Sequence, residues 1–354
     1  MKKSILFIAA GALALSACTS SEVIEEGVQS NAIGFQNVVS KESRALTSAD
    51  LKFFSVYGYY VTENDNTPVV VFNGQDVART DVSKNEWTYT PTRYWVPGAT
   101  YRFYAYSCEG TEFTAATGQA SLGSGNDVAG RALRLRNVIC DGSHQHDLIF
   151  ASNDEGIKGA GEETNTNAPV AFTFKHILSK INVVFSSGFP VGYEITVSDV
   201  KIKNFNDKAN YHPTNGWTNQ DESNQNNSAE IALAVEETAN IASSAAEEAN
   251  AKKVTTGIGY VIPYLYSDAE TSDDEAVELE FKVIVKNNNG ESILTNTLTG
   301  TWYPKWQAGF TYTYNVTIDG DATALWPIVF ETAQNIDDWT NGSTGAVDMK
   351  FSAN

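Results

Sequence analysis

Aromatic side chains alternate with small or polar residues from Trp87 to Tyr106, up to the dipeptide Pro97-Gly98 and again beyond it. Alternation with a period of two predicts strands with one buried face, and a Pro-Gly dipeptide predicts a turn between them. We therefore predict a β-hairpin whose aromatic side chains lie in a hydrophobic core.

The spacing W-x-x-G-x-x-Y-x-aromatic begins at Trp95 in this hairpin and occurs a second time from Trp306 to Tyr314. An alternating strand follows it on both occasions. A chain of 354 residues is long for one β-domain but suits two domains of common size. The repeat therefore predicts two sheet domains of similar plan, each with this hairpin in its core.

Other alternating segments predict strands along most of the chain. They comprise residues 33–39, 54–61, 69–72, 172–185 with an interruption, 195–202, 259–266, 277–286, 292–302 and 310–318, and residues 148–151 form a short apolar run. Short strands separated by turns are typical of β-sandwiches. We predict an all-β fold with an N-terminal domain at 45–168 and a C-terminal domain at 169–354.

Three segments are polar or rich in Gly and lack periodicity, namely 109–130, 153–167 and 204–227. We predict surface loops there. The segment 230–253 is rich in Ala and Glu and has few β-formers, so it suits either a short helix or a disordered insertion.

Basic, apolar and small residues follow one another at the amino terminus. Two lysines precede an apolar run from Ile5 to Leu15, which leads to Ser-Ala-Cys18. This is the order of a signal peptide at residues 1–17, and the apolar run is too short to span a bilayer. Because the cysteine directly follows the small residues, as in a bacterial lipobox, we predict that Cys18 is lipidated. The alternative is an ordinary signal peptide that ends near a cysteine.

Removal of the signal peptide takes the formal charge from −19 to −21. A charge of this sign argues against nucleic acid or an anionic membrane as a partner and suits an exported surface protein, attached by lipid alone. In that setting the remaining cysteines, Cys108 and Cys140, either form a disulfide or stay as thiols.

No pattern predicts catalysis or a bound cofactor. The sequence His144-x-His146-Asp147 offers two or three metal ligands, but the other two histidines lack ligand spacing, so a solvated loop is the better interpretation. There is no Gly-x-Ser-x-Gly elbow, phosphate-binding loop or dinucleotide fingerprint. We therefore predict a protein that is not an enzyme, without cofactor or metal.

Two segments carry a resemblance to a known family. One is Arg93-Tyr94-Trp95-x-Pro97 with Tyr101-x-Phe103-x-Ala105-Tyr106-Ser107, and the other is Phe174-Lys175-His176-x-Leu178-Ser179-Lys180. In these residues and their order the chain, from Cys18 to about Trp339, resembles the fimbrillin (Mfa-like) family of outer-membrane lipoproteins that build type V pili. It departs from the family pattern at Cys108, where Pro is frequent, and at Ile177, where Ala is usual.

The resemblance implies two transthyretin-like β-sandwich domains in tandem, export as an outer-membrane lipoprotein, cleavage after an arginine by a trypsin-like surface protease, and polymerisation with other pilin subunits by strand donation. Arg44 fits such cleavage, because it follows the predicted first strand and lies in a polar segment. Cleavage between Arg44 and Ala45 would remove residues 18–44, the tether and first strand together, and leave an unpaired groove. The alternative is an ordinary surface arginine.

The carboxyl-terminal tail offers a replacement strand. Val347-Asp-Met349-Lys-Phe351 alternates strictly and follows a Gly- and Ser-containing segment that suits a flexible lead. We predict a donor strand with Val347, Met349 and Phe351 as the inserted side chains. The alternative is an edge strand that packs on its own domain.

These observations favour a structural pilin subunit of a surface fimbrium that supports cell adhesion. The alternative is a tip adhesin or a monomeric surface lipoprotein that binds a host glycan or protein.

Overall fold

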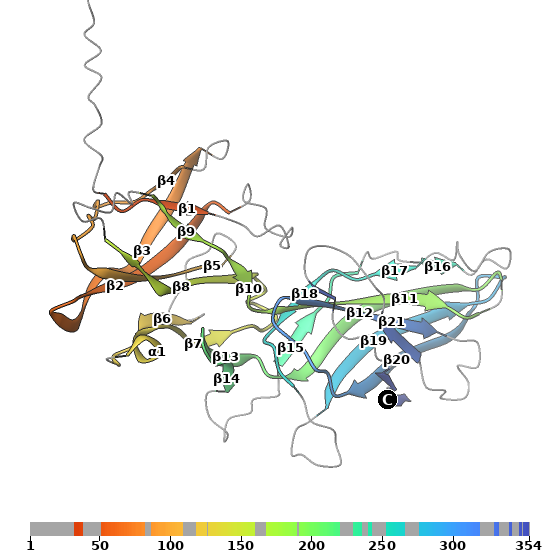
Figure 1. Cartoon of the computed structure of the whole chain (residues 1–354). Helices are drawn as coiled ribbons and strands as arrows, with labels where there is room; N and C mark the ends of the chain where they lie inside the picture. Colours follow the sequence, from red (N-terminus) through yellow and green to blue (C-terminus); the bar gives the residue numbers. More distant parts are fainter. Residues whose placement is uncertain are drawn as a thin grey trace, which may run out of the picture.

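The computed structural model describes residues 32–37, 51–81, 86–108, 118–125, 127–159, 168–189, 191–219, 229–235, 240–242, 253–265, 276–318, 329–332, 340–341, 347–348 and 350–353. The predicted all-β fold is confirmed: apart from the four-residue helix α1 (Val128–Arg131), the regular elements of the described residues are strands. Two β-rich halves lie end to end (Figure 1).

The N-terminal half is built on a six-stranded sheet in the order β10-β8-β5-β2-β3-β4. These strands are β10 (Lys175–His176), β8 (Leu148–Lys158), β5 (Thr100–Cys108), β2 (Phe53–Thr62), β3 (Asp65–Asp81) and β4 (Glu86–Thr88). A separate parallel pair consists of β1 (Phe35–Asn37) and β9 (Val170–Phe172). Its side chains pack with those of one face of this sheet in the N-terminal core.

Strand β5 is buried on both of its faces from Phe103 to Tyr106, where its residues are apolar or aromatic without interruption. Tyr101 and Phe103 belong to the core that includes β1 and β9, whereas Tyr104 and Tyr106 face a second cluster on the other side of the sheet. That second face is covered by a four-stranded sheet in the order β14-β13-β7-β6. Its strands are β6 (Gln119–Leu122), β7 (Leu133–Ile139), β13 (Lys208–His212) and β14 (Gly216–Asn219).

The C-terminal half is a sandwich of a seven-stranded and a six-stranded sheet. The first contains β17 (Val254–Thr255), β11 (Ser179–Ser187), β21 (Phe310–Ile318), β22 (Val329–Thr332), β24 (Val347–Asp348), β18 (Gly259–Val261) and β23 (Thr340–Asn341). The second contains β15 (Ala229–Ala232), β12 (Glu194–Phe205), β19 (Val277–Lys286), β20 (Ser292–Trp302), β25 (Lys350–Ala353) and β16 (Asn240–Ala242).

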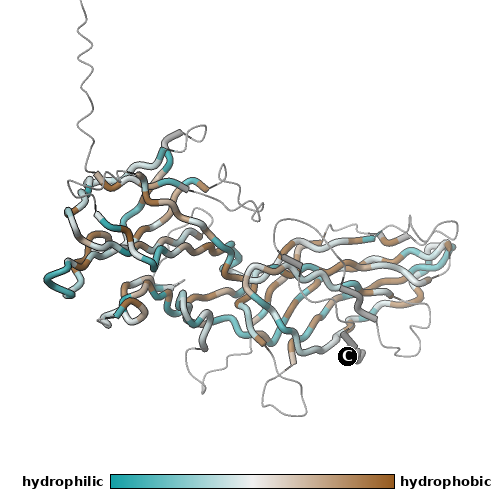
Figure 2. The backbone as a smooth tube through the Cα atoms, viewed as in Figure 1, coloured by the Kyte–Doolittle hydropathy of each residue, from teal (hydrophilic) through white to brown (hydrophobic). Residues whose placement is uncertain are grey.

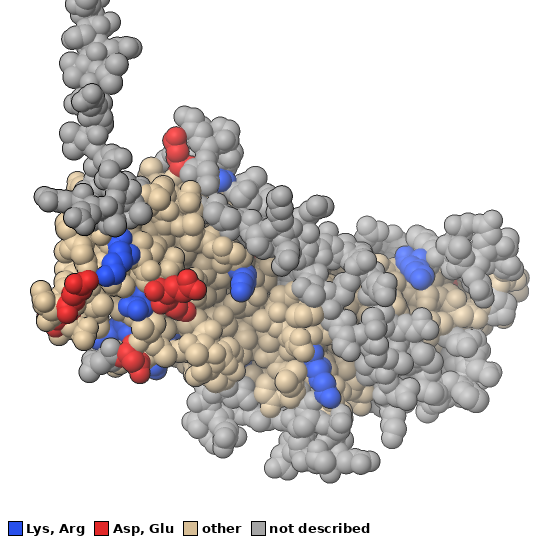
Figure 3. Space-filling view, in the orientation of Figure 1, with Lys and Arg blue, Asp and Glu red and all other residues tan. Residues whose placement is uncertain are grey.

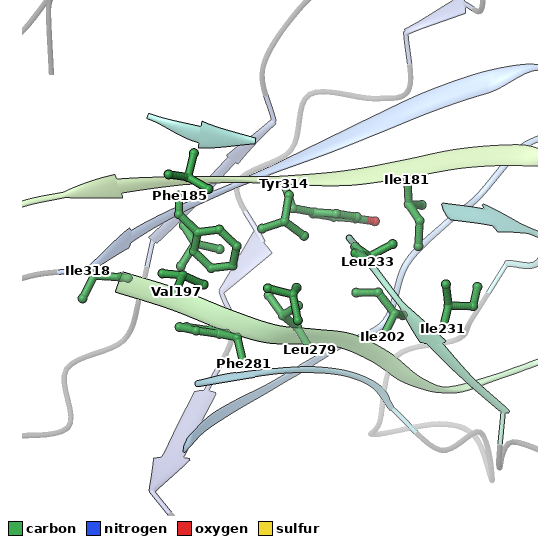
Figure 4. Packing of buried hydrophobic residues seen from close by; sticks show 14 of the residues in the cluster. Ile181, Phe185, Val197, Ile202, Ile231, Leu233, Leu279, Phe281, Tyr314 and Ile318 are labelled. Atoms are coloured by element: carbon green, nitrogen blue, oxygen red, sulfur yellow. The ribbon is translucent and has the colours of Figure 1, made fainter. Parts of the chain in front are cut away.

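Strict alternation places the core of this sandwich. In β19, every second side chain from Val277 to Val285 is buried, and apolar positions recur along the strands (Figure 2). Phe185 of one sheet meets Phe281 of the other across the core, with ring centroids 4.9 Å apart (Figure 4). On the outer face, the ammonium of Lys203 lies 2.6 Å from a carboxylate oxygen of Glu280.

The sequence repeat corresponds to a repeated turn. The hydroxyl of Tyr101 accepts a hydrogen bond from the backbone N–H of Val96 at 2.7 Å, and the hydroxyl of Tyr312 accepts one from the N–H of Gln307 at 2.9 Å. The glycine of each copy, Gly98 and Gly309, has a positive φ of 74° and 76°, a conformation that favours glycine. Each turn leads into a nine-residue strand, β5 or β21.

The hairpin predicted from Trp87 to Tyr106 is wrong in its pairing. The turn is present, but β4 and β5 are separated in the sheet by β2 and β3. Period-two alternation marks a half-buried strand without identifying its neighbour: here β4 pairs with the preceding strand β3, and β5 pairs with β2 and β8.

Four other predictions also require correction. The predicted loop 109–130 contains β6 and most of α1, the predicted loop 153–167 begins with the last six residues of β8, and the predicted loop 204–227 contains β13 and β14. The described parts of 230–253 form strands β15 and β16 rather than a helix. These short polar strands are stabilised by distant partners, as in the pairing of Tyr211 with Leu135, and local propensity does not reveal such partners.

The two halves are joined through the segment Phe174–Lys180. Phe174 lies in the N-terminal core beyond the predicted boundary at residue 168, whereas Ile177 and Leu178 lie in the second cluster, together with Ile262, which follows β18 of the C-terminal half. The hydroxyl of Ser179 donates to the carbonyl of Gln307 at 2.7 Å. Buried His176 lies 2.8 Å, through Nδ1, from a carboxylate oxygen of buried Asp147.

Candidate functional site: the slot of the leading strand

Residues 32–37, which we call the leading strand, fill a slot in the N-terminal core. Ile33 is 1% exposed and Phe35 is 3% exposed, so both side chains are fully enclosed. Gly34 and Gln36, which alternate with them, remain half-buried. A segment near the start of the described chain therefore supplies two side chains to a core otherwise built from strands that follow it.

The slot holds the main chain of the leading strand from both sides. On one side β1 runs parallel to β9, and the N–H of Val170 donates to the carbonyl of Gly34 at 2.8 Å. On the other side the N–H of Ile33 donates to the carbonyl of Arg93 at 2.8 Å, beside an antiparallel bridge between Ala32 and Tyr94. The leading strand thus lies between β9 and the turn that precedes β5 (Figure 1).

Aromatic rings surround Phe35. Their centroids lie 5.4 to 6.1 Å from its own and belong to residues of four other strands and one loop: Phe54, Phe72, Tyr89, Phe103 and Phe172. All but the Phe172 pair meet at steep angles, between 62° and 88°, the edge-to-face geometry that favours aromatic pairs. Phe35 is therefore the central anchor of the leading strand.

The described chain is anchored in this core on both sides of the predicted cleavage site. Before that site, β1 ends at Asn37; after it, Leu51 is the next described residue and is 3% exposed in the same core. Arg44 and Ala45 lie outside the described residues, as does Cys18.

The predicted donor tail pairs with its own domain in this structure. β24 pairs with β22, and β25 pairs antiparallel with β20, where Phe351 lies opposite Gly300. Val347 lies in β24 and Phe351 in β25, whereas Met349 is outside the described residues. Both strands stand at the end of their sheet order, so each has a single neighbouring strand among the described residues.

The remaining sequence candidates form no second site in the described part of the chain. His144 contacts Asp141 at 2.7 Å, whereas Asp147 contacts His176, so the residues of the His144-x-His146-Asp147 motif have separate partners. Within the described residues no group of three or more metal-ligating side chains gathers. Cys108 and Cys140 form no disulfide. Burial raises the pKa of the Cys140 thiol, which keeps it protonated.

On the face shown in Figure 3, Lys and Arg side chains of the N-terminal half lie among Asp and Glu rather than in a continuous basic patch. Helical structure within the described ranges is confined to α1, and none of it has the length and hydropathy of a membrane span.

Comparison with known proteins identifies the class. A family model described as fimbrillin-like matches residues 44–339, so this chain belongs to the fimbrillin-like family. The family consists of structural proteins of cell-surface fimbriae and is not a class of enzymes. The match begins at Arg44 and stops at Trp339, and the leading strand and the tail both lie outside it.

Several solved structures are similar over most of their length. They include a candidate cell adhesion protein from Bacteroides uniformis (15% identity, 87% of this chain and 98% of that chain, TM-score 0.44) and a candidate adhesin from Bacteroides thetaiotaomicron (13%, 89% and 97%, 0.45). The fimbrial anchor protein Mfa2 from Porphyromonas gingivalis is also similar (10%, 81% and 90%, 0.33). No curated protein matches the sequence significantly.

Proposed function

We propose that this protein is a structural subunit of a type V pilus, exported to the outer membrane as a lipoprotein through Cys18. Cleavage between Arg44 and Ala45 removes the leading strand, and the subunits then polymerise by strand donation to form an adhesive surface fimbrium. One observation carries the proposal: Ile33 and Phe35 precede the cleavage site and are enclosed in the core of the domain that follows it.

Loss of the leading strand would leave a slot that favours occupation by another strand. The rings around Phe35 would be exposed to water, and the N–H of Val170 and the carbonyl of Arg93 would lose the leading-strand groups they now bond. Exposed apolar surface and unpaired main-chain groups at a sheet edge promote pairing with a strand of another chain.

The tail has the properties of such a strand. Its alternating residues Val347, Met349 and Phe351 match the alternation of Ile33 and Phe35, and β24 and β25 can leave without disrupting the interior of a sheet. Burial of three apolar side chains contributes roughly 5 to 9 kcal/mol. Because ordering about seven residues costs a similar amount, the backbone hydrogen bonds and slow unfolding must supply the rest of the polymer's stability.

Protease treatment tests the cleavage step. We expect an arginine-specific protease to convert the full chain into a fragment that begins at Ala45 and forms ladders in gels. Arg44→Lys should block both outcomes, whereas the control Arg136→Lys, at an exposed position of β7, should leave both unchanged. Full cleavage of the Arg44→Lys variant to the same fragment would contradict the assignment of the site.

Truncation tests the donor. Deletion of residues 342–354, which leaves β23 in the chain, should abolish the ladders while cleavage proceeds normally. Phe351→Ala should weaken polymerisation strongly, because Phe351 is one of the alternating apolar residues proposed to enter the slot. Lys350→Ala should weaken it little, because Lys350 is a polar residue between them. Unchanged ladders after truncation would exclude the tail as donor.

The pairing of β25 with β20 favours an alternative in which the tail stays on its own domain. The protein would then be either a tip adhesin that accepts a strand, or a monomeric surface lipoprotein that binds a host glycan or protein. A monomeric form would retain the lipid on Cys18 and the residues before Ala45 when isolated from cells, and would bind saturably to a glycan or protein array.

A further inference from the structure

The side chain of Tyr89 contacts the main chain of the leading strand as well as its core side chain. Its hydroxyl donates a hydrogen bond to the carbonyl of Ile33 at 2.6 Å and accepts one from the N–H of Arg93 at 3.2 Å. Its ring centroid lies 5.5 Å from that of Phe35 and 5.3 Å from that of Phe72. One residue thus engages a carbonyl and the neighbouring anchor ring of the same strand.

The environment keeps the Tyr89 hydroxyl a neutral donor. Burial raises the pKa of this phenol above its ordinary value, against the smaller opposing effect of the hydrogen bond with Arg93. Without the leading strand, the acceptor that remains near the hydroxyl is the carbonyl of Arg93, at a longer distance of 3.4 Å. A partly buried donor that loses its better acceptor favours any occupant that restores one.

We infer that Tyr89 is a positioning residue of the slot, whose hydroxyl holds a main-chain carbonyl of whichever strand occupies it. The inference rests on the proposed function, because it concerns exchange of the leading strand for a donor strand. Since the contact is made to a carbonyl, it does not depend on the side chains of the occupant. It fixes where along the strand the carbonyl lies, and therefore which residue takes the place of Phe35 beside the ring.

The matched pair Tyr89→Phe and Tyr94→Phe tests this role in the full chain. Phenylalanine keeps the ring of Tyr89 and removes only the hydroxyl, while Tyr94, in the same turn region, is 61% exposed. After cleavage at Arg44, native mass spectrometry measures how fast the cleaved leading segment dissociates from the fragment that begins at Ala45. We expect Tyr89→Phe to accelerate dissociation about threefold to tenfold, since one hydrogen bond is lost. Tyr94→Phe should match the parent chain.

A second measurement separates positioning from general stability. With the slot empty, the thermal unfolding midpoint of the fragment should be nearly the same for Tyr89→Phe and the parent. A large loss of stability there would show that Tyr89 acts on its own domain and would overturn the inference, as would an unchanged dissociation rate.

Failure of the proposed function gives a different result. If Arg44 is not cleaved, a site-specific protease sequence placed within residues 38–50 releases the same segment, and the dissociation rate is measured as before. Faster dissociation without ladders would support the role of Tyr89 and contradict polymerisation. Ladders together with an unchanged dissociation rate would support polymerisation and contradict the role of Tyr89.

Discussion

Phe35→Ala should lower the free energy of unfolding of the N-terminal domain by about 3–5 kcal/mol in the uncleaved chain. The side chain is 3% exposed and contacts five aromatic rings, so truncation leaves a cavity that rigid neighbours fill poorly. Urea unfolding followed by tryptophan fluorescence measures the effect, because Trp87 and Trp95 lie in the same core.

Two comparisons make this prediction specific. Gln36→Ala changes the neighbouring half-buried side chain of the same strand and should alter stability by no more than about 0.5 kcal/mol. The polymer formed after cleavage should be unaffected by Phe35→Ala, because residue 35 would leave with the removed segment. Phe35→Ala polymers with altered stability would show that the leading strand remains in the assembled fimbrium.

The contacts of the leading strand explain how it can be both stabilising and replaceable. Within the described residues it pairs with one strand, β9, and forms a bridge to Tyr94, so few of these main-chain hydrogen bonds must break when it leaves. Its contribution to the stability of the N-terminal core comes mainly from the side chains of Ile33 and Phe35. A strand with two apolar side chains at the same spacing can substitute for it, which is the geometric requirement that strand donation places on a subunit.

The sequence predicted those elements whose side-chain pattern is imposed by one large core. Strand β19 alternates strictly because each inward residue meets the opposite sheet, and the prediction 277–286 coincides with its bounds. The four-stranded sheet was missed, since β13 and β14 lie in an Asn- and Asp-rich segment. β14 pairs with β13, and β13 pairs with β7, which lies about 70 residues earlier in the sequence and is not indicated by local propensity.

The same distinction applies to the slot. Alternation from Ile33 predicted a strand, and Phe35 is buried as that pattern requires. The parallel pairing with β9 and the Tyr89 hydroxyl are non-local, because a period of two indicates which side chains face inward but not which main chain lies beside them. Tyr89 stood out in the sequence only as one aromatic residue of the alternating segment.

Asp147→Ala should lower the free energy of unfolding of the full chain by about 3–5 kcal/mol, because it leaves a buried imidazole N–H without its carboxylate. The Asp147 and His176 side chains are 2% and 4% exposed, and His176 lies in the segment that joins the two halves. Urea unfolding of the purified chain measures the loss. Asp147→Asn, which keeps an acceptor oxygen, should cost about 1 kcal/mol.

The same loop offers a matched control for this buried pair. Asp141 and His144 form a second aspartate–histidine contact at 2.7 Å, but their side chains are 33% and 29% exposed. Asp141→Ala should therefore cost about 1 kcal/mol or less, since water replaces much of what is lost. Equal losses for Asp147→Ala and Asp141→Ala would contradict a stabilising role for burial of the His176 pair. Packing of Ile177 and Leu178 in the second cluster, together with Ile262, would then be the remaining contact that stabilises the junction.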